Sequence, residues 1–436
     1  MPLYDEITAA LQDEQTVACV MESELEPTSG AGTPICPPTY APDKSLGEKS
    51  PRFAVTAAGF IPAPDDTGWH HLLIRDGRET PRRACRVVVN SVGACAGINE
   101  TGTYMQQHRL GLTLPAFVVT GTATGTVESA VAATKEKKKL TAQRVADVEA
   151  SLAHQVNSWT LAHRTADSWL QYADGGNGRQ IWADDDSDIK QVLLNISHER
   201  GDLVYGYAPN VAVYGAWLSS GTARRHAIPR AYTCEITGYG AVSLQRGATK
   251  LDPTGGTISD ARSISTSDDG IGLTDKGGKK PAELGFGQVP ASVTDRAFVC
   301  ELILRKASIS LRALDLFRYP DDVDGTKAFA AKRVYVLLAM AGHLLGGEDG
   351  FLRSGCDLVT VDERWGWRRH GSRTVVDMTV PSLTELAEAL QQAVAAAEQV
   401  GLAFQEPVTV GFSAAQVGLI IDRVLKNATE TVASAS

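Results

Sequence analysis

The sequence predicts an α+β fold built on a largely antiparallel sheet. Its candidate elements follow the order strands, helical insertion, strands, long loop, strands, helix, strand, helix. This order lacks the regular alternation of strands with helices that would favour a parallel sheet. The 436 residues suffice for one large domain with insertions or for two domains.

The first part of the chain is predicted to be mainly strands. A short helix at the start precedes a strand over Thr16–Met21, and a proline- and glycine-rich loop follows over residues 28–51. Further strand compositions lie at residues 55–61, 84–89 and 115–125. Between Val145 and Trp159 apolar residues recur at spacings of three and four, which is typical of an amphipathic helix. We therefore expect a helical insertion over residues 127–173.

The centre of the chain is expected to return to strands. The predicted segments are residues 203–208, a strand end at 214–217, a strand at 232–236, and a hairpin of 298–304 with 307–311. We expect that hairpin to turn at Arg305-Lys306. Residues 245–285 lack apolar periodicity and are rich in small polar residues, which predicts a loop.

Two later helices have clear end signals. Gly346-Gly347 should stop a helix over Thr326–Leu345, and Ser382 with Glu385 forms a capping box that opens another. A strand over residues 408–412 and a last helix over 414–425 follow, and we expect the tail from Asn427 to be disordered.

The composition indicates a reduced, soluble protein. Seven cysteines without a Cys-x-x-Cys pair match neither a disulfide scaffold nor a zinc knuckle. The N-terminus has no signal-peptide pattern, and no apolar run reaches the roughly 20 residues that span a bilayer. We expect a cytoplasmic location and no membrane partner.

Charge is unevenly distributed. The formal net charge of −9 argues mildly against a nucleic-acid partner. However, the acidic residues gather around 5–26, 184–188 and 321–324, away from the arginine-rich segments. A local basic groove on an acidic protein would bind phosphates while suppressing unspecific contacts.

Catalytic patterns are weak in this sequence. The histidines are scattered, and neither Gly-x-Ser-x-Gly nor His-Glu-x-x-His occurs. A phosphate loop ending at Gly278-Lys279 fails, because Leu273 stands where a glycine is needed and Lys280 where a hydroxyl is needed. We expect no catalytic residue, no metal and no cofactor. The alternative is a metal-dependent nuclease that uses the acidic loop at 184–188 with His70-His71.

The most informative stretch is Val213–Val242. A small polar turn and the cations Arg224, Arg225 and Arg230 lie there between two strand candidates. Arginine presents a flat fork that matches phosphate oxygens, so a turn held between rigid strands can follow a polyanion.

This stretch resembles the central block of a CRISPR-associated family, the backbone guide-binding subunit of the type I-U (also called I-G) Cascade effector complex, within the RAMP superfamily. Further blocks agree in order: Pro37–Tyr40, Arg86–Glu100, Lys280–Pro290, Ser308–Pro320 and Leu352–Leu358. One block departs from the family, which usually has Gln-Ala-Asn-Arg where this chain has Cys95-Ala96-Gly97-Ile98. That turn has therefore lost a polar, cationic patch.

The resemblance implies a modified RRM-like (ferredoxin-like) antiparallel palm with a helical insertion and an extended thumb-like loop. We divide the chain accordingly into palm segments, insertion, thumb and tail: 1–126 (palm, with the proline-rich loop), 127–190 (insertion), 191–240 (central palm strands), 241–285 (flexible thumb), 286–426 (last palm part with C-terminal helices) and 427–436 (disordered tail).

The resemblance also implies partners. They are a guide crRNA, target DNA reached through the guide, further copies of the chain in a helical backbone, a large subunit and a guide-end-binding subunit. The predicted RNA contacts are Arg224, Arg225, Arg230, Lys276, Lys279, Lys280, Arg52 and Arg305.

Overall fold

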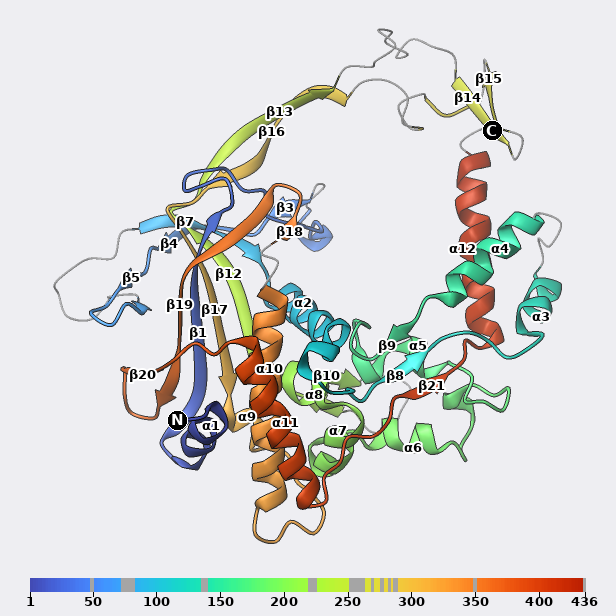
Figure 1. The fold of residues 1–436 in the computed structure, drawn as a ribbon. Helices are drawn as coiled ribbons and strands as arrows, with labels where there is room; N and C mark the ends of the chain where they lie inside the picture. Colours follow the sequence, from blue (N-terminus) through green and yellow to red (C-terminus); the bar gives the residue numbers. More distant parts are fainter. Residues whose placement is uncertain are drawn as a thin grey trace.

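The computed structural model describes residues 1–47, 51–71, 83–134, 140–218, 226–250, 263–267, 270–274, 278–280, 284, 289–347 and 351–433. An eight-stranded antiparallel sheet curls through its centre (Figure 1). Seven strands follow the order β18 (Phe351–Arg353), β19 (Cys356–Arg369), β1 (Thr16–Pro27), β17 (Leu302–Ser310), β12 (Tyr232–Tyr239), β7 (Arg83–Asn90) and β4 (Val55–Phe60), and β20 (Val375–Met378) pairs with β19.

Four of these strands form the palm. Along the chain the order is β1, helix α2 (Val92–Met105), β12, β17, helix α10 (Thr326–Gly347) and β19. In the sheet the order is β19-β1-β17-β12, with every neighbouring pair antiparallel. This is the split βαββαβ arrangement of ferredoxin-like and RRM folds. The predicted α+β palm is thus confirmed.

Helix α10 is the central helix of the core. By length and composition it could cross a bilayer, but 78% of its most apolar window is buried inside the protein. Its residues from Val334 to Ala341 are all buried, on every side of the helix, as expected for a helix enclosed by other elements. The predicted helix is confirmed and includes Gly346 and Gly347, after which residues 348–350 lie outside the described residues.

Helices gather on one side of the sheet (Figure 1). Helix α10 packs against α2 and α11 (Leu383–Gln399), and α11 also contacts α1 (Leu3–Gln12). The predicted capping box opens α11, with the Ser382 and Glu385 side chains each accepting the other's backbone N–H. Short α9 (Leu311–Leu314) follows β17 directly.

A second group of elements lies beyond α2. Its helices are α3 (Thr126–Ala133), α4 (Ala142–Ala153), α5 (Ser168–Gln171), α6 (Asp188–Asn195), α7 (Gly201–Tyr207), α8 (Pro209–Tyr214) and α12 (Ala414–Ala433). A small sheet of β21 (Val408–Val410), β8 (Phe117–Val119) and β9 (Val156–Asn157) joins them, and α12 packs on α3 and α4. The predicted strand at 203–208 is wrong, because Gly201–Tyr207 is the helix α7.

A long ribbon continues two palm strands. Strand β13 (Val242–Lys250) follows β12, β16 (Val289–Val299) precedes β17, and the two pair antiparallel (Figure 1). The predicted loop over 245–285 is therefore partly wrong, since residues up to Lys250 are strand. Further along, β14 (Ser263–Ser267) pairs with β15 (Gly270–Thr274), and β14 lies against α12.

Small hairpins complete the fold: β2 (Thr39–Tyr40) with β3 (Arg52–Phe53), β5 (Ala63–Pro64) with β6 (His70–His71), and β10 (Ala216–Leu218) with β11 (His226–Ile228).

Three local predictions are corrected. Arg305-Lys306 lies inside β17, and the chain turns at Cys300-Glu301 instead. The block at Cys95–Ile98 is part of α2, not a turn. Helix α12 continues to Ala433, past the expected start of the tail at Asn427.

Candidate nucleic-acid interface

The palm sheet has one face covered by helices and one open face, and β17 presents a cation to each. Successive residues of a strand point to opposite sides. Arg305 is accordingly directed at α10, whereas Lys306 is directed at the open face. The two neighbouring cations therefore have different surroundings.

Arg305 is built into the helix-covered face. It is 8% exposed, and its Nη2 donates to the His343 carbonyl oxygen at 2.7 Å. A Cβ at Gly347 would overlap Arg305 Nη1, and the buried guanidinium is already held by the His343 carbonyl, so a glycine fits best beside it. Arg305 thus caps the last turn of α10, where free carbonyls favour a cation.

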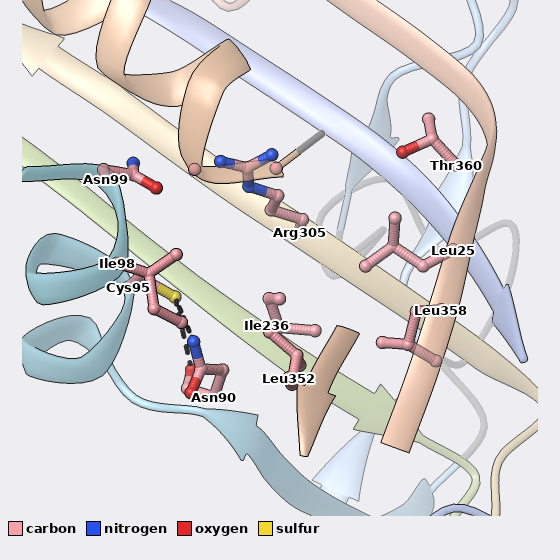
Figure 2. Close-up of a pocket in the computed structure, with 12 residues that line it drawn as sticks. Leu25, Asn90, Cys95, Ile98, Asn99, Ile236, Arg305, Leu352, Leu358 and Thr360 are labelled. Atoms are coloured by element: carbon pink, nitrogen blue, oxygen red, sulfur yellow. Dashed lines mark hydrogen bonds between the residues drawn. The ribbon is translucent and has the colours of Figure 1, made fainter. Parts of the chain in front are cut away.

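Arg305 also lines two cavities. The smaller, of about 30 Å³, is shown in Figure 2 and holds mainly apolar side chains with Asn90 and Asn99. The larger, of about 470 Å³, includes Glu363. Burial raises the pKa of Glu363, but the nearby His343 ring and the hydrogen bond from Trp365 outweigh burial and hold it below its ordinary value.

The open face carries a row of alternating charges. The strand register aligns Arg364, Glu22, Lys306 and Glu235 across β19, β1, β17 and β12. Glu22 is 5% exposed, and Lys306 Nζ lies 2.8 Å from its Oε2. Burial raises the pKa of Glu22, but hydrogen bonds from His70 and Lys306 outweigh burial and lower it overall. Glu22 is therefore a carboxylate held by cationic and polar donors.

A hairpin, which we call the strap (residues 63–71, with β5 and β6), lies over part of this face. Its backbone is held by the charged row: His70 N donates to Glu22 at 3.0 Å, and Lys306 Nζ donates to the His70 carbonyl at 2.6 Å. Trp69 is 4% exposed and donates its Nε1 proton to Asp377 at 2.7 Å. Arg364 donates to the Thr67 carbonyl at 3.2 Å.

The open face of β1 and β17 offers no aromatic ring on which a base could stack. An RRM typically stacks bases on aromatic side chains of its sheet. By alternation, β1 directs Val20, Glu22 and Glu24 to the open face, and β17 directs Leu304, Lys306 and Ser308 there. These six residues, all described, include no aromatic ring.

Beside the strap the open face is hollowed. This hollow has a volume of about 340 Å³ and is lined by Thr56, Gly59, Phe60, Pro62, His70, Arg86, Tyr239 and Lys306. It combines cations with aromatic rings, which is the composition of single-stranded nucleic-acid sites. In the described part of the chain, the exposed Arg86 side chain has no ion-pair partner.

The hollow exists because of an irregularity in β4. The register between β4 and β7 shifts between Thr56 and Gly59, which is a β-bulge, and bulges bend the edge of a sheet. A Cβ at Gly59 would lie 3.0 Å from the Ala84 carbonyl oxygen, so a larger residue would push the strands apart. The bulge, β7, β12, β17 and the strap together bound the hollow.

The predicted RNA contacts do not meet at one place. Arg224, Arg225 and Lys276 lie outside the described residues. Arg230 is exposed just before β12 begins, whereas the ribbon leaves the other end of β12. Lys279 bridges to β14 at Ile264, with the exposed Lys280 next to it. Arg52 is exposed on β3, and Arg305 is buried on the helix-covered face.

Sequence reasoning missed the hollow. Arg86, Lys306, His70 and Tyr239 were absent from the predicted contacts although all four line it. Strand alternation could have indicated Lys306, because two neighbouring residues of a strand point to opposite faces and only one of Arg305 and Lys306 can face away from the helices.

The acidic and histidine residues of the metal alternative are engaged within the protein. His70 Nδ1 lies 2.7 Å from Glu22, and His71 Nε2 lies 2.8 Å from Asp65. In the acidic loop, Asn177 donates to Asp184 at 2.6 Å. Within the described ranges, no group of three or more His, Cys, Asp or Glu side chains is arranged to hold a metal ion.

One comparison with known proteins identifies a family. The sequence model of a family described as "CRISPR-associated protein GSU0053 (Cas_GSU0053)" matches residues 19–243, more than half of the chain. A solved chain described as "CRISPR RNA-guided surveillance complex, pre-nicking" is 8% identical and covers 94% of this chain and 100% of its own. Its TM-score of 0.28 is too low to support a conclusion. No curated protein matches the chain.

Proposed function

This chain belongs to the CRISPR-associated GSU0053 family, and from that premise we propose that it is a backbone subunit of a type I-U (I-G) RNA-guided surveillance complex. In this role it binds the guide RNA along its length and presents it for pairing with target DNA. The subunit itself performs no chemistry and works in the cytoplasm.

The observation that carries this proposal is the RRM-like palm with a basic, aromatic hollow on its open face. In RNA-guided systems base pairing reads the sequence, so the protein needs only to hold the backbone of the guide. Cations supply that affinity without sequence preference. Lys306, Arg86 and Tyr239 have the chemistry for such a grip, and the strap leaves them accessible.

The proposed assembly follows from the same role. Several copies would pack head to tail on one guide, and such heterologous contacts give open helical filaments. The long β13–β16 ribbon is the element best placed to reach beyond its own palm, because it extends outward from two palm strands (Figure 1). A large subunit and a guide-end-binding subunit would complete the complex.

The first test is purification of the chain after co-expression with the products of its neighbouring genes. We expect a large assembly with nucleic-acid absorbance, from which RNAs of uniform length can be extracted and sequenced. A chain that elutes as a small, RNA-free particle and degrades nucleic acid in an EDTA-sensitive manner would instead favour the nuclease alternative.

A further inference from the structure

We infer that the hollow beside the strap binds one nucleotide of a single-stranded RNA, with its phosphate on Arg86 and Lys306 and its base against Tyr239 and Phe60. This inference rests on the proposed function and specifies where the palm holds the strand. It differs from the contacts predicted from sequence, which lie in loops and on the ribbon.

The anionic part of the ligand is indicated by two cations of different kinds. Arg86 is exposed at the mouth of the hollow, and its guanidinium can pair bidentately with phosphate oxygens. Lys306 has three N–H donors. Glu22 and the His70 carbonyl take two of them, at 2.8 and 2.6 Å, which leaves one for a ligand. Its ammonium is thereby fixed in position before any ligand arrives.

The nearby carboxylates do not oppose an anion strongly. Glu22 is 5% exposed beneath the strap, so its carboxylate faces away from solvent, and it is neutralised by contacts with His70 and Lys306. Glu235 accepts a hydrogen bond from the Thr237 hydroxyl at 2.8 Å and does not line the hollow. Among the described residues that line the hollow, Arg86 is therefore the cation without an ion-pair partner.

The base is indicated by the two rings. Tyr239 lies on the open face of β12 directly opposite Arg86 of β7, and both it and Phe60 are half-buried. Every base has a flat π-face, so stacking on such rings tolerates any sequence. A guide of variable sequence requires this tolerance.

The size of the site limits it to a small part of the strand. Its volume of about 340 Å³ is near the lower end of the range for small-ligand sites, roughly 300–1,000 Å³. The strap closes the side toward β1 and β19, where Trp69 is anchored to Asp377. An RNA strand bound in the hollow would therefore have to continue over β12, β7 and β4.

The decisive experiment uses the purified complex reconstituted with single-stranded oligouridine RNA that carries 4-thiouridine. The variants are Arg86→Glu, Arg86→Gln, Tyr239→Ala and Tyr239→Phe. Arg312→Glu is the matched control, because Arg312 is exposed on α9 and makes the same charge change away from the hollow. Affinity is measured over a salt series, and ultraviolet crosslinks are mapped by mass spectrometry.

We expect Arg86→Glu to weaken binding and to reduce the slope of log affinity against log salt by about 0.7, the value for one phosphate on a single strand. Tyr239→Ala should weaken binding by about tenfold, within the range for loss of one stacked base, while Tyr239→Phe and Arg312→Glu stay near wild type. Wild-type crosslinks should fall on the peptides that contain Tyr239 or Phe60.

Two other results have distinct meanings. If RNA is bound and crosslinked elsewhere, and the Arg86 and Tyr239 variants bind like wild type, the nucleotide site is refuted while the proposed function stands. If the wild-type complex binds no RNA at all, the proposed function itself fails, and the site fails with it. The wild-type crosslink map decides the matter even if a variant does not fold.

Discussion

Each face of the palm sheet contains a cation, a histidine and a glutamate, in different settings. On the helix-covered face Arg305 lies with His343 and Glu363, and on the open face Lys306 lies with His70 and Glu22. Arg305 is 8% exposed and caps α10, whereas the Lys306 side chain is 41% exposed and holds Glu22 and the strap. Similar sets of polar residues thus serve the core on one side and an accessible surface on the other.

The difference comes from what covers each face. Helix α10 is enclosed on every side, so an arginine beneath it must satisfy its donors inside the protein. The strap is a short hairpin at the surface, and a cation under its edge keeps contact with solvent. Position along β17 therefore decides whether a cation stabilises the fold or remains available to a ligand.

The largest effect should come from Arg305→Met. Removing the guanidinium leaves the His343 carbonyl without its charged donor and enlarges the cavities that Arg305 lines, and loss of a hydrogen bond to a charged group costs about 1.5–3 kcal/mol. Chemical unfolding should show this loss. Lys306→Met should cost less, about 1 kcal/mol, because the lysine is partly solvated and Glu22 keeps its hydrogen bonds from His70, and it should also weaken RNA binding. Equal destabilisation by the two variants would remove the distinction between the faces.

Glu22→Gln should have an intermediate effect. It removes the charge that holds His70 and Lys306, and an imperfectly satisfied buried group costs about 1–3 kcal/mol. The pKa of Glu22 is below its ordinary value of 4.5 in the folded protein, so its ionised form contributes stability above that pH. The difference between variant and wild type should therefore shrink as the pH falls below about 4.5. A difference that stays constant down to low pH would contradict this assignment.

Gly68→Ala should have the smallest effect. Gly68 has φ +88°, and a left-handed conformation costs a residue with a Cβ about 1–2 kcal/mol. The added Cβ would also collide with the Arg364 guanidinium, but that flexible side chain can move. We expect faster amide hydrogen exchange in the strap and unchanged exchange in α10. Faster exchange in both would show that the strap and the core unfold together.

The sequence was informative where a local pattern determines the structure. The helix over Thr326–Leu345, the capping box at Ser382 and the strand over residues 84–89 all follow from short-range signals and are confirmed. The segment at 203–208 was misjudged, because a short apolar run does not distinguish a buried helix from a strand. The turn predicted at Arg305-Lys306 was wrong. Two adjacent charged residues are typical of a turn, but here β17 is paired with a strand on each side and continues through them.

The hollow could not have been assembled from the sequence. Its residues come from β4, the strap, β7, β12 and β17, which are distant in the chain and meet only through the order of the sheet. Its depth also depends on the bulge between Thr56 and Gly59, which is a property of pairing with β7. Clusters of arginine in loops, in contrast, are visible in the sequence itself, and the predicted contacts were therefore chosen mainly from loops.

The ribbon has a consequence for how the chain tolerates changes in length. Tyr239 pairs with Leu302 in the palm, and three residues further along β12's continuation Val242 pairs with Val299. The junction is pinned by the Glu301 amide, which donates to the Tyr239 carbonyl at 2.9 Å. Deleting facing residues in pairs from the distal ends of β13 and β16 keeps the register of the remaining pairs. The junction and the in–out alternation of side chains along β17 then stay unchanged. The length of the ribbon can therefore change, by engineering or in evolution, while Lys306 continues to face the open side of the sheet.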